Sequence, residues 1–233
     1  MASFNDVRCP VDNESVGAGQ TIEVIIGVEG RVFHVHEKLL CSRSAFFGAA
    51  LNKEWKEGQN RKVELLQESC ADFSRYVHWL YSGKLAVKPS TPGQPLYDAM
   101  MALYVLGEKI IDPRFQDRVI DAIVASTRER NGTAGRLYPN MTHVTCIYKT
   151  TPEGSPARRL LVDMYAIKAG PTWFHDEKPE DIMCEFFFDL TCALMERREV
   201  TDKTRQPIAE LDKGSPCSYH KHGKDETCPS KTG

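Results

Sequence analysis

The chain has 233 residues, enough for one large domain or for one domain followed by a second helical lobe. Apolar residues make up 41%, and the 16 glycines raise this to about 48%, inside the globular range of about 45–50%, so we expect a buried core. Thirty basic and 32 acidic residues give a net charge of −2, which argues against nucleic acid as the main partner. The arginine pairs at 158–159 and 197–198 are interpreted as solvated helix faces.

A membrane span and a secretory signal are not expected. The longest apolar stretch, 182–195, is interrupted by Glu185 and Asp189 and is too short and too charged to cross a bilayer. The polar start lacks the apolar centre of a signal peptide. Eight cysteines are scattered along the chain, several of them in apolar runs, which predicts reduced and mostly buried thiols. We therefore expect a soluble protein inside the cell, in the nucleus or the cytoplasm.

The first elements predicted along the chain are strands and short helices. Residues 21–27 are rich in β-branched side chains and residues 31–35 alternate, which predicts a β-hairpin with a glycine-containing turn. Residues 36–52 carry apolar side chains at helical spacing, and Ser42 or Ser44 is predicted to cap the second of two helices there.

A short strand over 62–66 and a helix over 71–83 follow. In that helix the apolar positions recur at i, i+3, i+4 and i+7 from Phe73, and Gly83 is predicted to end it. A loop over 88–95 contains three prolines and a glycine.

The second half of the chain predicts mainly helices. Residues 96–110 and 112–130 are two amphipathic helices, the second with Asp112 as N-cap and Pro113 in its first turn. Residues 141–151 fit a helix or a strand equally well, because β-branched residues are frequent there.

Two further helices are predicted after this ambiguous segment. Residues 155–170 form a helix with Ser155 as its cap and Gly170 as its end. Residues 178–199 form a long helix with acids in its first turn and arginines in its last, which suits the helix dipole.

Two motifs in the first half resemble those of one known family. Residues 33–47, FHVHEKLLCSRSAFF, resemble the "F-x-V-H-K-x-(V/L)-L-x-x-x-S-x-(Y/F)-F" segment of BTB/POZ domains, and residues 81–85, YSGKL, resemble the Y-T/S-G end of that family's third helix. The likeness covers residues 20–130. It implies an α+β fold with helices clustered around a small sheet, and a role in protein–protein interaction. Downstream, residues 136–199 resemble the helical region of fungal single-BTB proteins.

We therefore predict four parts. A flexible arm over 1–20 precedes a BTB/POZ domain over 21–130, an all-helical C-terminal lobe over 136–199, and a polar tail over 200–233. The resemblance also implies a homodimer. The family often has Asp ahead of its first strand, near the dimer interface of animal relatives, whereas this chain has Thr21, so the sequence leaves strand-exchanged dimerisation open.

Trp55 and Glu57 form the first candidate partner-binding site. In relatives that recruit a cullin-type ubiquitin-ligase scaffold, a hydrophobic-x-Glu motif occupies this place, so the resemblance implies the same partner here. A large aromatic side chain is a natural interface anchor, and a nearby carboxylate supplies charge and orientation. The alternative is that Trp55 covers the domain's own core and that Glu57 is solvated.

The tail contains a candidate metal site. Two thiols and two imidazoles are a complete ligand set for tetrahedral zinc, and they are Cys217, His220, His222 and Cys228. The C-x2-H-x-H-x5-C spacing is unlike that of a DNA-reading zinc finger and would require an irregular loop. The alternative is a tail in which these residues occur together by chance.

The sequence offers little support for an enzyme. It contains no glycine-rich phosphate loop, no G-x-S-x-G elbow and no H-E-x-x-H motif. We predict an interaction module or adaptor, one that presents substrates to a cullin-type ubiquitin ligase. The alternative is a metal-binding, transcription-associated regulator whose tail chelates zinc.

Overall fold

The structure is a computed structural model that describes residues 19–52, 60–89, 96–129, 135–174, 178, 183–201 and 219–221. The chain divides into two compact units, residues 1–73 and 74–233. Helices predominate around a single three-stranded sheet in this part of the chain, which confirms the α+β class. No helix within the described ranges is long and apolar enough to cross a membrane.

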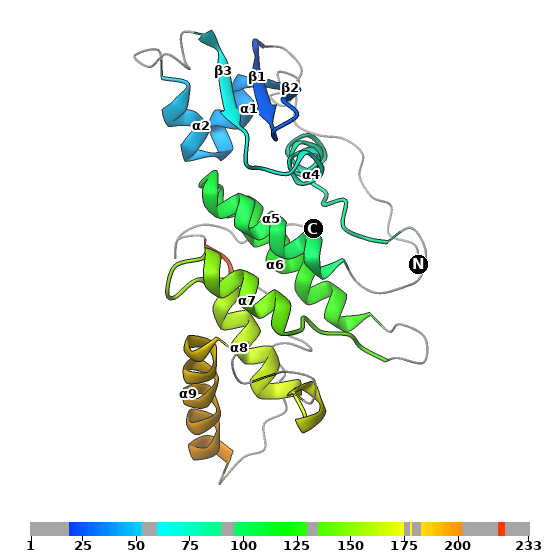
Figure 1. The fold of residues 1–233 in the computed structure, drawn as a ribbon, viewed down its shortest axis with the longest axis vertical. Helices are drawn as coiled ribbons and strands as arrows, with labels where there is room; N and C mark the ends of the chain where they lie inside the picture. The colour runs from blue at the N-terminus through cyan, green and yellow to red at the C-terminus, as the bar shows by residue number, and fades with distance from the viewer. Residues whose placement is uncertain are drawn as a thin grey trace, which may run out of the picture. The chain divides into compact units, whose positions relative to one another are not determined.

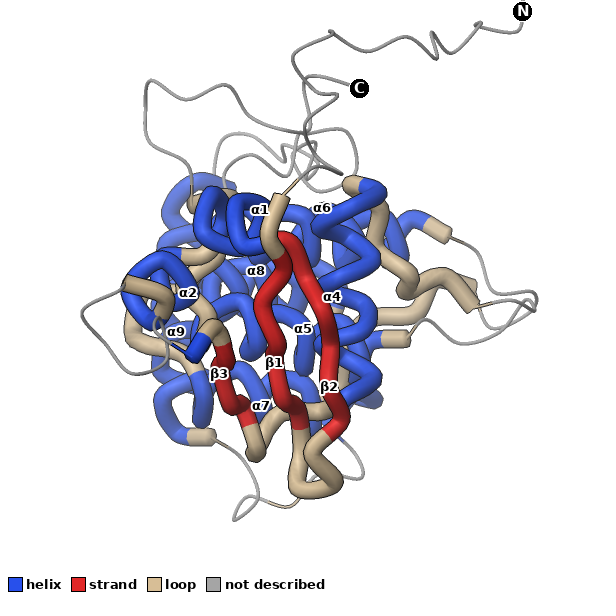
Figure 2. Tube along the Cα trace, turned by 90° about the horizontal axis from the view of Figure 1, so that it is seen from above, coloured by secondary structure: helices blue, strands red, loops and turns tan. Residues whose placement is uncertain are grey.

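The first unit contains the sheet, in the order β2-β1-β3 (Figure 2). Its strands are β1 (Thr21–Ile26), β2 (Arg31–His36) and β3 (Lys62–Leu65). The predicted hairpin is confirmed, because β1 pairs with β2 antiparallel, and β3 runs parallel to β1. Gly27 and Gly30 have φ values of 72° and 66°, and glycine is the residue that adopts this left-handed backbone most readily.

One face of this sheet is buried. Side chains alternate along a strand, and Ile22, Val24 and Ile26 are accordingly buried on the same face of β1. Phe47 and Phe73 complete this core from the helices, with their ring centroids 6.5 Å apart.

In the part of the chain that the structure describes, two short helices follow β2. They are α1 (Glu37–Arg43) and α2 (Ala45–Ala50). Ser44 caps α2 as predicted, since its Oγ accepts a hydrogen bond from the main-chain N–H of Phe47 at 3.1 Å. Helix α4 (Cys70–Ser82) begins in the first unit and ends in the second, just before Gly83, whose φ is 68°.

The second unit is a set of packed helices (Figure 1). Helix α5 (Tyr97–Lys109) packs on α6 (Pro113–Arg128), and α7 (Met141–Thr150) contacts both α5 and α8 (Pro156–Lys168). A 3-10 helix (Pro171–Phe174) follows, and α9 (Cys184–Thr201) packs on α8. The ambiguous segment 141–151 is therefore helical.

Asp112 shows how a local signal and a long-range contact combine. Its Oδ1 accepts the main-chain N–H of Phe115 at 3.0 Å, which confirms the predicted N-cap of α6. Its Oδ2 accepts the hydroxyl of Tyr76 at 3.0 Å, from α4. The capping carboxylate is fully buried, so the same side chain both starts α6 and holds it against α4.

The structure corrects several predictions. Ser155 precedes α8 but makes no capping hydrogen bond, because its Oγ lies 3.1 Å from the hydroxyl of Tyr104 instead. Arg158 is buried rather than solvated. Cys184 and Cys192 are exposed and the other thiols in the described part are half-buried, so the expectation of mostly buried thiols is wrong there. The last helix begins at Cys184 rather than near residue 178.

Candidate interaction surfaces

Trp55 and Glu57 lie outside the described residues. The flanking elements are described: α2 ends at Ala50 and β3 begins at Lys62. In the sequence, the pair therefore lies between α2 and β3, which is an edge strand of the described sheet. Their role in partner binding stays a prediction.

Of the four candidate zinc ligands, the structure describes His220. Cys217, His222 and Cys228 lie outside the described residues. The imidazole of His220 is buried, and its Nε2 lies 2.8 Å from Oδ1 of Asp121 on α6. Among the residues that the structure describes, no group of three or more potential ligands is gathered for a metal ion.

His220 belongs to a short segment, Tyr219–Lys221, that lies against the helices of the second unit. The side chains of Tyr219 and His220 are buried there. The carboxylates that the segment contacts come from three helices, and we call them together the acidic groove. They are Glu108 on α5, Asp117 and Asp121 on α6, and Asp163 on α8.

The first two residues of the segment contact carboxylates through their side chains. The hydroxyl of Tyr219 donates to Oδ2 of Asp163 at 2.8 Å, and Oδ1 of the same carboxylate accepts from Arg197 on α9 at 2.8 Å. His220 pairs with Asp121 as described above. A carboxylate shared between a tyrosine and an arginine links the segment to both α8 and α9.

Lys221 contacts the groove through both its main chain and its side chain. Its N–H donates to Oδ1 of Asp117, a carboxylate that is almost fully buried within α6. Its Nζ lies 2.9 Å from Oε2 of Glu108, which also accepts from Nε2 of Gln116 at 2.7 Å. Charge-assisted hydrogen bonds of this kind are stronger than neutral ones, so Lys221 is well anchored.

A second cluster centres on Arg158 in the first turns of α8. Its NH2 group donates to the main-chain oxygens of Tyr148 and Thr151, and its Nε donates to the Thr151 hydroxyl at 3.2 Å. Its NH1 lies 3.1 Å from Oε2 of Glu185 on α9. The guanidinium thus satisfies carbonyls at the end of α7, where a helix leaves them without internal partners.

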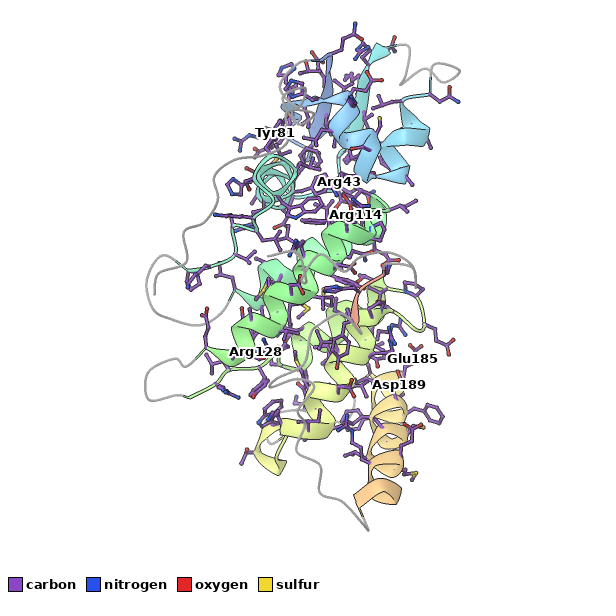
Figure 3. The ribbon with its side chains drawn as sticks, turned by 180° about the vertical axis from the view of Figure 1, so that it is seen from behind. Arg43, Tyr81, Arg114, Arg128, Glu185 and Asp189 are labelled. Carbon is purple, nitrogen blue, oxygen red and sulfur yellow. The ribbon has the colours of Figure 1, made fainter. Side chains whose placement is uncertain are left out.

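The aromatic neighbour of this arginine is Tyr148. The guanidinium of Arg158 lies 4.5 Å from the ring centroid, and the Tyr148 hydroxyl donates to Oδ2 of Asp189 at 2.7 Å. Burial, followed by the hydrogen bond to Asp189, raises the pKa of Tyr148 well above its usual range. Glu185 and Asp189, both labelled in Figure 3, come from the first two turns of α9, so this cluster joins α7, α8 and α9.

Helix α9 leaves an apolar stripe exposed. Phe188 is 70% exposed and Met195 is 60% exposed, and Cys184 and Cys192 are exposed at matching helical spacing. A cavity of about 400 Å³ lies beside it, lined by α8 and α9 side chains that include Val162, Asp163, Ala193 and Glu196. Exposed large apolar side chains of this kind are typical of contact surfaces.

His143 forms a buried polar site at the start of α7. It is the third helical residue, and its Nδ1 accepts the main-chain N–H of Asn140 while the Asn140 side chain accepts from the N–H of His143. Its Nε2 lies 3.1 Å from Oδ1 of the exposed Asp98. Burial is the larger effect and lowers the pKa of His143 despite Asp98. A cavity of about 240 Å³ opens beside this imidazole.

Sequence reasoning did not find the acidic groove or the Arg158 cluster. Glu108 and Lys221 are 113 residues apart, and each looks like an ordinary surface charge on its own helix or tail. The one local signal was the grouping of Tyr219, His220 and Lys221 in the tail, which was interpreted as part of a metal site.

Comparisons with known proteins agree on the first half of the chain. Residues 13–105 match the family model of the BTB/POZ domain. A stretch of 66 residues, 28% of this chain, is 33% identical to the Kelch repeat and BTB domain-containing protein 4 of Homo sapiens, Mus musculus and Pongo abelii. That stretch spans 12–13% of those proteins.

Among solved structures, the BTB domain of zebrafish PATZ1 aligns with a TM-score of 0.35 and 16% identity, over 50% of this chain and 86% of that one. The family match rests on the same residues as the hairpin, the short helices and the third strand described above. Residues 13–105 of this chain form a BTB/POZ domain, a module for protein–protein interaction.

Proposed function

We propose that the chain is an adaptor that works inside the cell, presenting other proteins to a cullin-type ubiquitin-ligase scaffold. The observation that supports this is the BTB/POZ match together with Trp55 and Glu57, placed in sequence between α2 and β3. The relatives that match are themselves named as BTB domain proteins with Kelch repeats, so a BTB module joined to other parts is common to them. The scaffold is the partner that Trp55 and Glu57 would contact.

The test is co-precipitation of a cullin-type scaffold by the full chain and by a double variant, Trp55→Ala with Glu57→Ala. We expect the variant to lose at least nine-tenths of the captured scaffold at an unchanged melting temperature, because a central aromatic anchor commonly contributes about 2 kcal/mol or more to binding. The control is Val28→Ala with Glu29→Ala, which replaces an exposed apolar residue and a glutamate in the β1–β2 turn. Undiminished capture by the folded Trp55/Glu57 variant would reject the scaffold contact.

Self-association is part of this proposal. It is supported by the BTB/POZ family match. Thr21, where relatives often have Asp, begins β1 and pairs with His36, so this position is the first residue pair between β1 and β2. Because Thr21 replaces the Asp that lies near the dimer interface of animal relatives, the homodimer that we propose does not depend on strand exchange through the N-terminal arm.

The second candidate is a zinc-binding, transcription-associated regulator. The observation that favours it is the pairing of His220 Nε2 with Asp121. Metal-ligating histidines commonly use one ring nitrogen for a carboxylate and the other for the metal, and the contact of His220 with Asp121 is of the first kind. Cys217, His222 and Cys228 would supply the other three ligands.

Elemental analysis of the purified full chain tests this candidate. We expect about one zinc ion per chain, lost in a Cys217→Ser and Cys228→Ser variant because the site then keeps two ligands instead of four. A Cys184→Ser and Cys192→Ser variant is the control, since both of these thiols are exposed on α9. A chain without zinc, or zinc retained after loss of Cys217 and Cys228, would rule the site out.

A further inference from the structure

We propose that the acidic groove is a binding site for short basic peptides with a Tyr-His-Lys pattern, and that the chain's own residues 219–221 occupy it. A partner with the same pattern would have to displace this internal segment before it could bind. The inference deepens the proposed adaptor function, on which it rests for its cellular meaning, by naming the chemistry of one class of partner. It adds a site in the second unit that is separate from Trp55 and Glu57.

The contacts are those of a ligand with its site. Each of the three residues in the segment meets a different carboxylate, and the carboxylates come from α5, α6 and α8. The groups that bind are a phenol hydroxyl, an imidazole, an ammonium group and one main-chain N–H. A free peptide carries every one of these groups, so the contacts can be transferred to another chain.

Burial identifies the anchoring residues. The side chain of His220 has no exposed surface, and Tyr219 as a whole is 9% exposed, although both lie in a segment of three residues. Buried tyrosines and desolvated charge pairs at the centre of an interface usually carry most of the binding energy. Tyr219 and His220 therefore determine which peptide fits.

Charge explains the preference for a basic peptide. Two groove carboxylates already face arginines, since Asp121 lies 3.4 Å from Arg118 and Asp163 lies 2.8 Å from Arg197. Lys221 adds a third cation to this set, since its Nζ lies 2.9 Å from Oε2 of Glu108. An acidic or neutral peptide would not complement this surface.

The number of residues before the segment permits more than one position for it. Residues 202–218 lie between α9 and Tyr219 in the sequence, and a chain of this length spans at most about 60 Å. The contacts of Tyr219, His220 and Lys221 favour the groove among the places within that reach. Tethering at this scale gives an effective concentration on the order of 1 mM, so the internal segment competes strongly with a free peptide.

The experiment measures binding of a fluorescent peptide, SYHKHGK, which reproduces residues 218–224. Fluorescence anisotropy is recorded with the full-length wild type and with a full-length emptied variant carrying Tyr219→Ala, His220→Ala and Lys221→Ala. EDTA is present, so that metal bridging cannot mimic binding. We expect saturable binding to the emptied variant and at least ten-fold weaker apparent binding to the wild type, because the wild-type groove is filled.

Groove variants locate the site. Asp121→Asn with Asp163→Asn on the emptied background should weaken binding at least ten-fold, whereas Glu153→Gln, an exposed acid just before α8, should leave it unchanged. Two altered peptides test the same contacts without any substitution in the groove. They therefore remain informative if the Asp121/Asp163 double variant does not fold. A scrambled peptide of the same composition should not bind, and a Tyr→Phe peptide, which lacks the hydroxyl for Asp163, should bind about ten-fold more weakly.

The proposal is overturned if the folded emptied variant does not bind the peptide, if the scrambled peptide binds equally well, or if the wild type binds as tightly as the emptied variant. Any of these results would make the segment a fixed part of the fold. The assay contains no scaffold protein, so its failure is distinct from a failure of the Trp55/Glu57 experiment. Either result can hold without the other.

Discussion

At the scale of single residues, the environment of His143 determines how this unit responds to pH. The imidazole accepts a hydrogen bond at Nδ1 from Asn140, so the neutral form with its proton on Nε2 suits the site. Asp98 opposes this preference from 3.1 Å, but its side chain is 94% exposed and water screens it. Burial therefore prevails, and the pKa of His143 is lowered in the folded state.

Stability should consequently fall as the pH is reduced. A folded-state pKa below the ordinary value of 6.5 means that the unfolded chain binds the proton more readily. The contribution of His143 is complete above pH 6.5 and is lost as the pH falls from 6.5 towards the folded-state pKa. Urea unfolding between pH 7.5 and 5.5 should show this loss, at no more than about 1.4 kcal/mol per pH unit for one proton.

His143→Gln should remove this part of the slope and keep the helix start. Glutamine at the third helical position is the usual partner in a capping box, so the cap of α7 is preserved. His78→Gln, on the exposed side of α4, is the matched control and should leave the slope as in the wild type. An identical pH dependence in the wild type and in His143→Gln would show that another group is responsible.

At the scale of elements, one arginine holds three helices. Arg158 on α8 donates to carbonyls at the end of α7 and faces Glu185 on α9. A lysine keeps the charge but has a single side-chain nitrogen. It cannot donate hydrogen bonds to the three oxygens of Tyr148 and Thr151 that the planar guanidinium reaches. The packing of α7 against α8 therefore depends on the guanidinium itself.

Arg158→Lys should lower the free energy of unfolding by about 2–3 kcal/mol, because buried carbonyls lose their donors. Arg159→Lys is the matched control: it is the next residue on α8, it is exposed, and the same change there should stay within about 0.5 kcal/mol. Chemical denaturation of both variants measures the difference. Equal effects of the two substitutions would mean that the hydrogen bonds of Arg158 contribute nothing beyond its charge.

Elements could be predicted where their signals are local. The caps formed by Ser44 and Asp112 were predicted correctly, because a cap is decided within four residues. Ser155 was assigned wrongly as a cap, since its hydroxyl finds Tyr104 more than 50 residues away. Residues 141–151 stayed ambiguous for a related reason. Their helical state as α7 depends on burial against other helices, and intrinsic helix propensity does not encode that burial.

At the scale of the whole molecule, functional sites differ in how far a sequence can predict them. The Trp55/Glu57 pair lies within three consecutive residues, so a family resemblance in the sequence is enough to predict it. The contacts between the acidic groove and its segment join residues as far apart as Glu108 and Lys221, and without the fold nothing indicates that these residues meet. The single cue was composition, because Tyr219, His220 and Lys221 stand together in a polar tail.

The two proposed binding sites lie in different units of the chain. The BTB/POZ match covers all of β1 to α4 and most of α5, and the proposed scaffold contact lies within it, between α2 and β3. The acidic groove and its internal segment lie in the second unit. An adaptor needs one surface for the scaffold and another for the protein that it presents. The proposed Trp55/Glu57 site would bind the scaffold, and the acidic groove would bind the presented protein.

Calorimetric titration of the purified full chain with a purified cullin-type scaffold measures whether the chain binds this partner through Trp55 and Glu57. We predict saturable heat with one scaffold molecule per chain, and its loss in the folded Trp55→Ala and Glu57→Ala variant. The Val28→Ala and Glu29→Ala variant should titrate as the wild type does. Absence of heat with the folded wild type, or full binding by the Trp55/Glu57 variant, would contradict the proposed adaptor function.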